Sequence, residues 1–406
     1  MGPGKLFEIH PAVGLTEAWT DNFNVSSNRP QQNYRTTLDL GLNLIMNAAL
    51  TKGFLASSSG LTYDTADSSK GIKVFPTISA GVTQLLSPRL TMTAIESFTR
   101  NDDPGQADRF GLRRERQTFT SNTFGVSAAY LIDLLATEAH YNNSIFMSGG
   151  TDTVSHVLGA SASTRIGPSN TAQAGYEFSY SKTTRSDSDS VNGSSSPDHS
   201  TGNTIYGSLS RQISQYSSAG ISSSYTIQSA NDARIWNVSL FSTYGLPTGL
   251  SVSSSVGYSL LSSDNQKNTS GITTNSTLSY RFTRAVVSVG VFQDFRQTGL
   301  EGQNFGIVQT TGFTGSFFYT FTPFMTGNIF AGYSTNDFTG VGNNASTPSS
   351  NTLTAGAGLN WQILRWLSSS LRYTYTLRSS GSGGSSVSGN GDISENQASL
   401  NLSASF

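Results

Sequence analysis

The chain has 406 residues, no cysteine and a net charge of −1, and only 12% of its residues are charged. Ordinary soluble domains carry roughly 25% charged residues, so the composition argues against a charged, water-exposed exterior. The near-neutral charge also argues against a general nucleic-acid binder. The 23 Phe, 16 Tyr and 4 Trp argue against disorder. No run of about 18 apolar residues is present, which excludes a transmembrane helix.

Residues 1–7 are expected to be a short leader, either an expression scar or the trimmed start of a mature chain whose secretion signal lay upstream. From residue 8 on, period-2 alternation predicts strands, each long enough to cross a bilayer when tilted, which takes about 9–11 residues. In chain order the predicted strand cores are 8–20, 35–46, 53–65, 74–86, 90–101, 116–131, 135–147, 152–166, 171–184, 203–213, 218–229, 233–246, 250–262, 271–282, 285–298, 308–321, 325–335, 351–363, 367–378 and 393–406.

The predicted strands have two different faces. In residues 353–363, one face carries Leu359 and Trp361, while the other carries Thr354 and Asn360. A two-sheet sandwich would place charges on its outer face, whereas the polar face here is small and neutral. This pattern is typical of a wall between lipid and a water-filled interior.

The predicted connections alternate between short and long. The short ones contain Pro and Gly where tight turns need them, as in Leu246-Pro247-Thr248-Gly249. The long ones are polar: Asn24–Asn33, Asn101–Arg116, Ser186–Gly202, Thr339–Ser350 and Ser379–Asp392. Short turns on one rim and long loops on the other are expected of an outer-membrane barrel.

The chain ends on a strand whose apolar and small polar residues alternate up to a C-terminal Phe. This ending resembles the closing strand of bacterial outer-membrane barrels, which carries an aromatic signal read by the insertion machinery. In this chain Leu400, Leu402 and Phe406 match that signal, and Ala404 departs from it because an aromatic residue is usual there.

These observations predict an all-β fold: a closed antiparallel transmembrane β-barrel of about 20 strands, with 18 as the alternative. The strands, with short periplasmic turns and long extracellular loops, form a single barrel domain over residues 8–406. Glu17 and Glu96 fall on the face that their neighbours mark as lipid-facing. A β-bulge or a register change is therefore expected in the first and fifth strands.

Strand parity assigns ten charged or titratable side chains to the lumen. They are Asp39, Glu138, His140, Arg165, Glu177, Arg281, Asp294, Arg296, Arg372 and Arg378. Both signs are present, whereas a strongly ion-selective pore lines its constriction with one sign. The remaining lumen face is mainly hydroxyl and amide, with aromatics such as Phe292, Phe318 and Phe330. This lining favours neutral polar solutes, carbohydrates among them, although any water-filled pore must also be polar.

No catalytic, cofactor-binding or metal-binding site is predicted. The four histidines are scattered over different strands and loops without ligand spacing, and no serine sits in a nucleophile elbow. The most charged segment is Asn101–Arg116, which carries four Arg against Asp102, Asp103 and two other acidic residues. We expect this loop to be solvated, to fold inward over the channel, or to contact lipopolysaccharide through its arginines.

The first segment, from Val13 to Phe23, carries the motif Trp19-Thr20-Asp21-Asn22-Phe23, and a strand with Thr36 to Leu42 follows. This opening resembles a family of outer-membrane β-barrel porins of the kind associated with exopolysaccharide export systems. Phe23 stands where an aliphatic residue is more usual. The resemblance implies a role as the outer-membrane conduit of such a system.

We therefore expect passive passage of hydrophilic solute through the bacterial outer membrane, by exopolysaccharide export or by polar-solute diffusion. The alternative is a non-conducting barrel that sheathes or docks a partner such as an electron-transfer cytochrome. The expected partners are outer-membrane lipid and lipopolysaccharide, the barrel-assembly machinery, and a periplasmic export or electron-transfer protein. No cofactor is expected.

Overall fold

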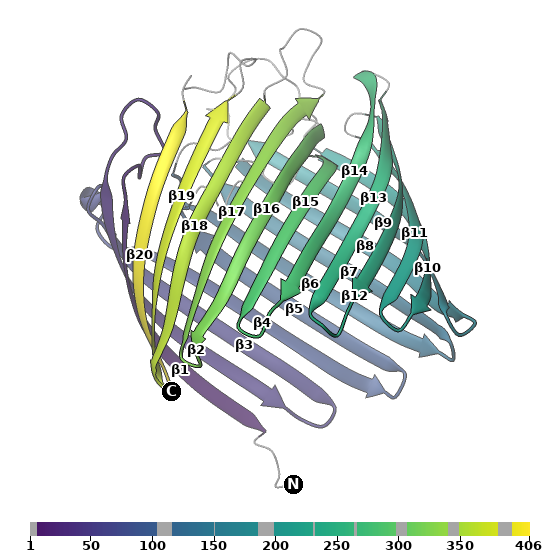
Figure 1. Cartoon of the computed structure of the whole chain (residues 1–406), viewed down its shortest axis with the longest axis horizontal. Coiled ribbons are helices and arrows are strands. Elements are labelled where there is room, and N and C mark those ends of the chain that lie inside the picture. The colour runs from purple at the N-terminus through teal and green to yellow at the C-terminus, as the bar shows by residue number, and fades with distance from the viewer. Residues whose placement is uncertain are drawn as a thin grey trace.

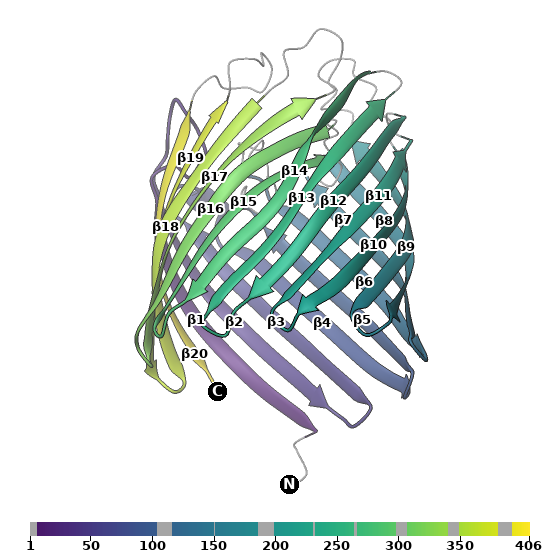
Figure 2. The same ribbon diagram turned by 45° about the vertical axis from the view of Figure 1, so that its right-hand side comes forward.

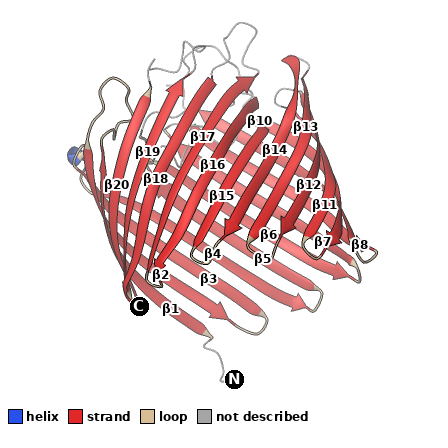
Figure 3. Ribbon diagram, viewed as in Figure 1, coloured by secondary structure: helices blue, strands red, loops and turns tan. Residues whose placement is uncertain are grey.

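The computed structural model describes residues 6–103, 116–149, 151–185, 199–229, 232–263, 266–297, 307–339, 349–380 and 392–406. They form one sheet (Figure 3). Its strands are β1 (Phe7–Thr20), β2 (Asn33–Asn47), β3 (Thr51–Asp64), β4 (Lys73–Ser87), β5 (Leu90–Asn101), β6 (Phe119–Ile132), β7 (Leu135–Ser148), β8 (Thr151–Ile166), β9 (Asn170–Arg185), β10 (His199–Ser214), β11 (Ser217–Gln228), β12 (Ala233–Gly245), β13 (Leu250–Ser263), β14 (Gln266–Arg281), β15 (Ala285–Gln297), β16 (Ile307–Thr322), β17 (Met325–Thr339), β18 (Ser349–Leu364), β19 (Leu367–Ser380) and β20 (Ile393–Ser405).

Each strand pairs antiparallel with its neighbours in the sequence, and β1 also pairs with β20. The sheet is therefore a closed barrel of 20 strands, as predicted (Figures 1 and 2). Closure leaves no free strand edge, which is the condition for a sheet to span lipid. None of the helical turns in the described ranges has the length and apolar character of a membrane-crossing helix.

The seam between β1 and β20 is held by side chains as well as by its ladder. Asp21 accepts hydrogen bonds from the backbone N–H and the side-chain amide of Asn396, at 2.8 and 2.6 Å. Asn22 is buried, and its amide donates to the carbonyl of Ser394 at 2.9 Å. Asp21 and Asn22 of the opening motif therefore connect the end of β1 to β20 by hydrogen bonds.

The two rims differ in their connections. The end at which both chain termini lie, called here the turn rim, carries the connections 48–50, 88–89, 133–134, 167–169, 215–216, 246–249, 282–284, 323–324 and 365–366 (Figure 1). The opposite end, the loop rim, carries the longer connections at 21–32, 65–72 and 102–118. Gly249 has φ +101°, and a Cβ there would overlap the carbonyl of Arg281, so this turn requires glycine.

Most of the exposed large apolar side chains lie on one face of the wall, as expected where lipid replaces water as the solvent. Aromatic residues gather on this face toward both ends of the strands. The exposed aromatics near the turn rim include Tyr130, Tyr216, Tyr244, Tyr280, Phe282, Phe321, Phe324, Trp361, Trp366 and Phe406. Those toward the loop rim are Tyr34, Tyr63, Tyr176, Tyr225, Trp236, Tyr258, Phe313 and Tyr373. Two such bands are the interfacial girdles of a membrane barrel.

Tyrosines of the girdle toward the loop rim also hydrogen-bond polar side chains on the adjacent strand. The hydroxyls of Tyr176 and Tyr373 donate to Asn203 and Asn396, both at 2.6 Å. The hydroxyl of Tyr258 donates to Ser270 at 2.8 Å. Each ring can stay in an apolar layer while its hydroxyl is satisfied, which is the behaviour of a tyrosine at a membrane interface.

The structure corrects two expectations about Glu17 and Glu96. The β1–β2 and β5–β6 ladders run in continuous register past both residues, so neither marks a bulge. Both carboxylates do lie on the outward face, where each accepts a hydrogen bond from a neighbouring strand. Thr36 donates to Glu17 at 3.0 Å, and Asn122 donates to Glu96 at 3.2 Å.

The register shifts lie elsewhere. Five ladders among the described residues contain a register shift. Four of these shifts lie next to a turn of the turn rim, as at Gln362/Leu364, and the fifth lies at Leu261/Ser263, toward the loop rim. Strand ends also differ from the predicted cores toward the loop rim: β10 begins at His199 and β14 at Gln266, within segments predicted as loop. These segments are polar, but their backbones still pair. The strands therefore continue beyond the apolar band, into the region where water replaces lipid around the barrel.

Candidate functional site

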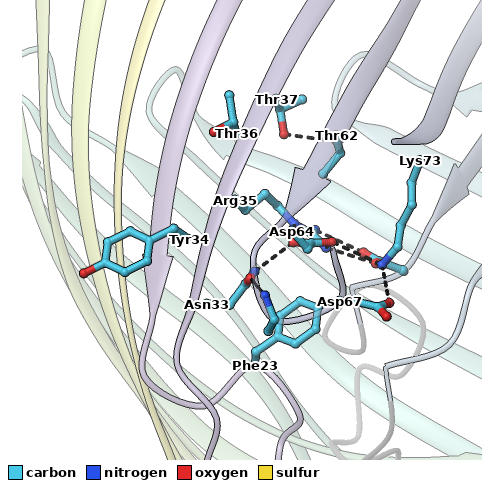
Figure 4. Close-up of polar contacts among 12 residues, drawn as sticks. Phe23, Asn33, Tyr34, Arg35, Thr36, Thr37, Thr62, Asp64, Asp67 and Lys73 are labelled. Atoms are coloured by element: carbon cyan, nitrogen blue, oxygen red, sulfur yellow. Dashed lines mark hydrogen bonds and ion pairs between the residues drawn. The ribbon is translucent and has the colours of Figure 1, made fainter. Parts of the chain in front are cut away.

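The pairing register divides every strand into an inner and an outer face. Residues opposite each other in a ladder share a face. Leu15 is on the outer face, so Leu38 of β2 and Leu402 of β20, which lie opposite it, are on the outer face as well. Outside the short stretches beyond the five register shifts, this parity can be followed through all the ladders and returns to β1 without conflict. Figure 4 shows the result locally: Tyr34 points away from the cluster that the next residue, Arg35, helps to form.

The ten predicted lumen residues all have the inner parity by this register. Each is opposite another inner-face residue: Asp39 is opposite Gly14, Glu138 opposite Ser161, Arg165 opposite Thr171, Arg281 opposite Val286, Asp294 opposite Thr310, Arg296 opposite Val308, Arg372 opposite Gly358 and Arg378 opposite Thr352; His140 and Glu177 are both opposite Gly159. The side chain of Arg296 lies outside the described residues. Their part in solute passage stays a prediction.

His140 and Glu177 are brought together across an intervening strand. Gly159 of β8 separates them, and a Cβ at that position would overlap the His140 imidazole. The missing side chain lets the imidazole cross β8, so that its Nε2 lies 3.8 Å from a Glu177 carboxylate oxygen. This partly exposed contact on the inner wall joins β7 to β9 across β8.

A large side chain also lies over an inner-face glycine on β17–β19. The ring of Phe330 covers Gly356, and the Arg372 guanidinium lies 5.5 Å from the ring centroid. The predicted lumen aromatic Phe292 likewise covers Gly312. Inner-face glycines therefore leave room for large side chains of the neighbouring strand, and these side chains lie flat against the wall.

The densest polar cluster lies inside the barrel at the loop rim (Figure 4). Arg35 donates to both carboxylate oxygens of Asp64, at 2.7 and 2.9 Å. The same guanidinium donates to both oxygens of Asp102 at 3.0 Å. Asp64 is 1% exposed and also accepts a bond of 2.8 Å from the Asn33 amide. Two buried carboxylates on one arginine form a strong bidentate anchor.

Lysines complete the charge balance of this cluster. Lys73 Nζ lies 3.1 Å from Asp64 and 3.0 Å from Asp67. Lys70 adds a second contact to Asp67 at 3.1 Å. Burial acts to raise the pKa of Asp67, but hydrogen bonds from Lys73 and Lys70 outweigh it and lower that pKa below its ordinary value. The connection 65–72 is thus tied to the inner wall by charge.

The connection 21–32 and the base of the charged loop close over the cluster. Phe23 is buried beneath the cations: the Arg116 guanidinium lies 4.6 Å from its ring centroid, and Arg35 lies 5.7 Å away. Arg116 Nε donates to the Phe23 carbonyl at 3.1 Å, and its Nη1 lies 3.6 Å from Asp102. We call Phe23, Arg35, Asp64, Asp67, Lys73, Asp102 and Arg116 the rim cluster.

The rim cluster was not predicted from the sequence. Arg35 has the same parity as Asp39, so alternation alone could have placed it inside. Asp64 is the last residue of β3 and Asp102 directly follows β5, and only the closed sheet shows that they meet on one side chain. Asp102 and Arg116, at the two ends of the loop Asn101–Arg116, belong to the rim cluster. Residues 104–115 lie outside the described part of the chain, so the three expectations for this loop stay predictions.

Other inner-face hydroxyls pair across strands. Thr37 and Thr62 are 3.1 Å apart, and further pairs at 2.7–3.3 Å are Thr83–Thr93, Thr153–Thr183, Thr204–Thr226, Ser218–Thr243, Ser222–Ser239 and Ser368–Ser403. Such pairs stabilise the sheet. Part of the hydroxyl lining is therefore structural and does not by itself indicate a solute.

The described residues form no cluster of three or more acidic or histidine side chains fit for a metal ion. At the C-terminus, Leu400 and Leu402 are exposed on the outer face. Phe406 stacks on Trp366 with ring centroids 5.8 Å apart, and its backbone N–H donates to the Pro11 carbonyl at 3.0 Å. The reading of this terminus by the insertion machinery stays a prediction.

The fold and its two-faced wall define a porin-like β-barrel of the bacterial outer membrane. A model of the family described as "Putative beta-barrel porin 2" matches residues 248–403. The predicted resemblance to a β-barrel porin family is thereby confirmed, over the C-terminal part of the chain rather than at the opening motif. The match concerns the family and carries no information about exopolysaccharide.

Solved structures agree on the fold. The ferric enterobactin receptor PfeA of Pseudomonas aeruginosa, in complex with BCV-L6, has a TM-score of 0.58 at 10% identity, covering 98% of this chain and 81% of the receptor. The siderophore receptor PirA of Acinetobacter baumannii has a TM-score of 0.56 at 11% identity, with 98% and 80% covered. No curated protein matches the chain. At these identities the likeness is one of architecture.

Proposed function

We propose that the barrel provides passive passage for hydrophilic solutes across the outer membrane, with exopolysaccharide export as its most specific role. General diffusion of small polar solutes is the close alternative. The observation that carries the proposal is a closed wall of 20 strands with a polar inner face. Barrels of about 16–18 strands already enclose an aqueous channel, so a wall of this size encloses one unless it is filled.

The charge pattern supports neutral cargo. The inner-face carboxylates Asp39, Glu138 and Glu177 are offset by arginines such as Arg165 and Arg372, spread over different strands. A ring of side chains with one sign of charge would select ions. The described side chains of the inner face form no such ring. The hydroxyl and amide groups between these charges hydrogen-bond neutral polar groups, as a carbohydrate conduit requires.

Partial narrowing is part of the proposal, because a freely open hole of this width would abolish the membrane barrier. The rim cluster supports it: charge-assisted bonds hold the connections 21–32 and 65–72, together with Arg116, against the inner wall. We propose that this fixed layer narrows the extracellular mouth over β2–β6. The proposed partners are outer-membrane lipid, lipopolysaccharide and the barrel-assembly machinery, together with a periplasmic export protein.

Single-channel recording on purified protein in planar bilayers tests the proposal. We expect stable ohmic steps with weak selectivity between cations and anions. A bilayer that stays closed under all voltages and salt conditions, although proteolysis shows the barrel inserted, would contradict passage and favour the non-conducting scaffold. Co-purification of a haem protein in the lumen would point to the same alternative.

Export needs a separate experiment in the bacterium that produces the protein. Removing the chain should retain exopolysaccharide in the periplasm and lower the amount in the medium, and the unchanged chain should restore it. If secretion is unaffected while uptake of small sugars falls, general diffusion replaces export as the role.

A further inference from the structure

A recess of about 690 Å³ lies on the inner wall between β5 and β8. Its lining includes the small residues Thr123, Gly125, Ser127 and Ser144 of β6 and β7, together with Glu138 and His140. Its volume is within the range of small-molecule sites, about 300–1,000 Å³. The rim cluster is not part of it.

The polar groups of the recess are available to a ligand. Within the described ranges, the hydroxyls of Thr123, Ser127 and Ser144 make no side-chain hydrogen bond, and neither does the Asn142 amide or the Glu138 carboxylate. The hydroxyl pairs described above satisfy one another across strands. Here three hydroxyls, an amide and a carboxylate converge on one hollow and retain their donors and acceptors.

An apolar row on the inner wall leads to this recess. Ile45, Phe54, Gly81 and Ile95 follow one another along a single ladder row, which continues to Gly125 in the recess. Phe54 and Ile95 are 44% and 48% exposed although they face inward. The row starts near the turn-rim ends of β2 and β3 and lies farther from the turns on β4, β5 and β6, so it climbs the wall.

The combination is suited to a pyranose. A sugar ring has an apolar face of C–H groups and an equatorial edge of hydroxyls, so it needs apolar contact and hydrogen bonds side by side. The recess offers Ile95 and Val157 next to Thr123, Ser127 and Asn142. Its charged groups are Glu138 and the Glu177 beyond His140, without a nearby lysine or arginine in the lining, which disfavours anionic sugars.

We propose that this recess is a binding subsite for neutral sugar units, and that the row of Ile45, Phe54 and Ile95 guides a chain of them along the wall. This inference rests on the proposed passage of hydrophilic solute and names its substrate class. Successive pyranoses would slide with their apolar faces on the row and exchange hydrogen bonds in the recess. The subsite would be weak, since passage requires release.

The test uses maltohexaose as a neutral, linear probe and measures how it interrupts the single-channel current. A polyethylene glycol of matched hydrodynamic size controls for simple obstruction. In the double variant Thr123→Val with Asn142→Ala, two hydrogen-bonding groups are lost, and we expect the apparent affinity for maltohexaose to fall about tenfold. Ile95→Ser should also weaken the block, because it removes the apolar contact.

Asn328→Ala is the matched control. Asn328 lies on the inner wall over Gly358, as Asn142 lies over Gly125, but on β17, away from the recess. This variant should leave the affinity within about twofold. The subsite is overturned, while passage stands, if maltohexaose blocks the original chain, the double variant and the control equally. The same holds if maltohexaose blocks no more strongly than polyethylene glycol.

If the original chain does not conduct, the proposed function fails, and calorimetry then decides the subsite separately. Maltohexaose titrated into the detergent-solubilised barrel should release heat with the original chain and with Asn328→Ala, and much less with Thr123→Val/Asn142→Ala. Equal heats in all three would overturn the subsite.

Discussion

At the residue scale, the rim cluster concentrates more charge than any other described part of the interior. Asp64 is the shared acceptor: Arg35, Lys73 and Asn33 all donate to one buried carboxylate. Burying several charges is costly, so such a cluster contributes little net stability but is very sensitive to the loss of one partner. Its role is to fix where the connections lie.

Replacing this carboxylate should therefore release the connections without opening the barrel. We expect Asp64→Asn to destabilise the packed state of residues 21–32 and 65–72 by about 3–5 kcal/mol, since Arg35 and Lys73 lose their main acceptor. Hydrogen exchange of these segments should accelerate, while the β7–β19 ladders keep their protection. Asp133→Asn is the control, because Asp133 is 83% exposed and lies 3.8 Å from Arg89 at the turn rim. Unchanged exchange in Asp64→Asn would show that the ladders alone hold these segments.

At the scale of the strand, the outward polar pairs show how the wall tolerates charge toward lipid. Glu96 lies opposite Phe124 on the outer face, and its carboxylate is satisfied by Asn122. The β5–β6 ladder keeps its register past this pair. A satisfied pair is nevertheless less favourable in lipid than two apolar side chains.

The double variant Glu96→Leu with Asn122→Val should accordingly stabilise the barrel in phospholipid vesicles, by about 1–3 kcal/mol. Urea unfolding followed by tryptophan fluorescence measures this. The single variant Glu96→Leu gains less, because it leaves the Asn122 amide unpaired on the outer face. Destabilisation by the double variant would indicate that this face contacts water or protein rather than lipid.

At the scale of the whole molecule, alternation and closure divide the chain between two solvents. Because the chain has no cysteine, single introduced cysteines report on one face without background. Thr374 lies opposite Gly356 on the inner face, and Tyr373 lies opposite Ala357 on the outer face.

A charged, membrane-impermeant thiol reagent should lower the conductance of Thr374→Cys and leave that of Tyr373→Cys unchanged. The reagent needs water to reach the thiol, and only the inner face provides it. Single-channel recording before and after the reagent measures the effect, with the cysteine-free chain as control. Modification of Tyr373→Cys alone would invert the assignment of faces and contradict a water-filled interior.

Local chemistry along the sequence determined the class of fold. Alternation with a period of two is a property of each strand, so the strand number, the two faces and the difference between the rims could be predicted residue by residue. The inner parity of His140 and Glu177 follows from the same rule. Strand ends were less accurate, as at Gln266, because polar residues outside the apolar band look like loop although the backbone still pairs.

Contacts between distant strands were decided by the tertiary structure alone. The meeting of Asp64 and Asp102 on Arg35 depends on register and curvature, and neither is encoded in a local pattern. The same holds for His140 reaching Glu177 over Gly159, and for the recess beside Ile95, where small side chains of two strands coincide. A sequence determines which face a side chain takes; ladder register and closure of the barrel decide its neighbours on that face, because they place residues from different strands side by side.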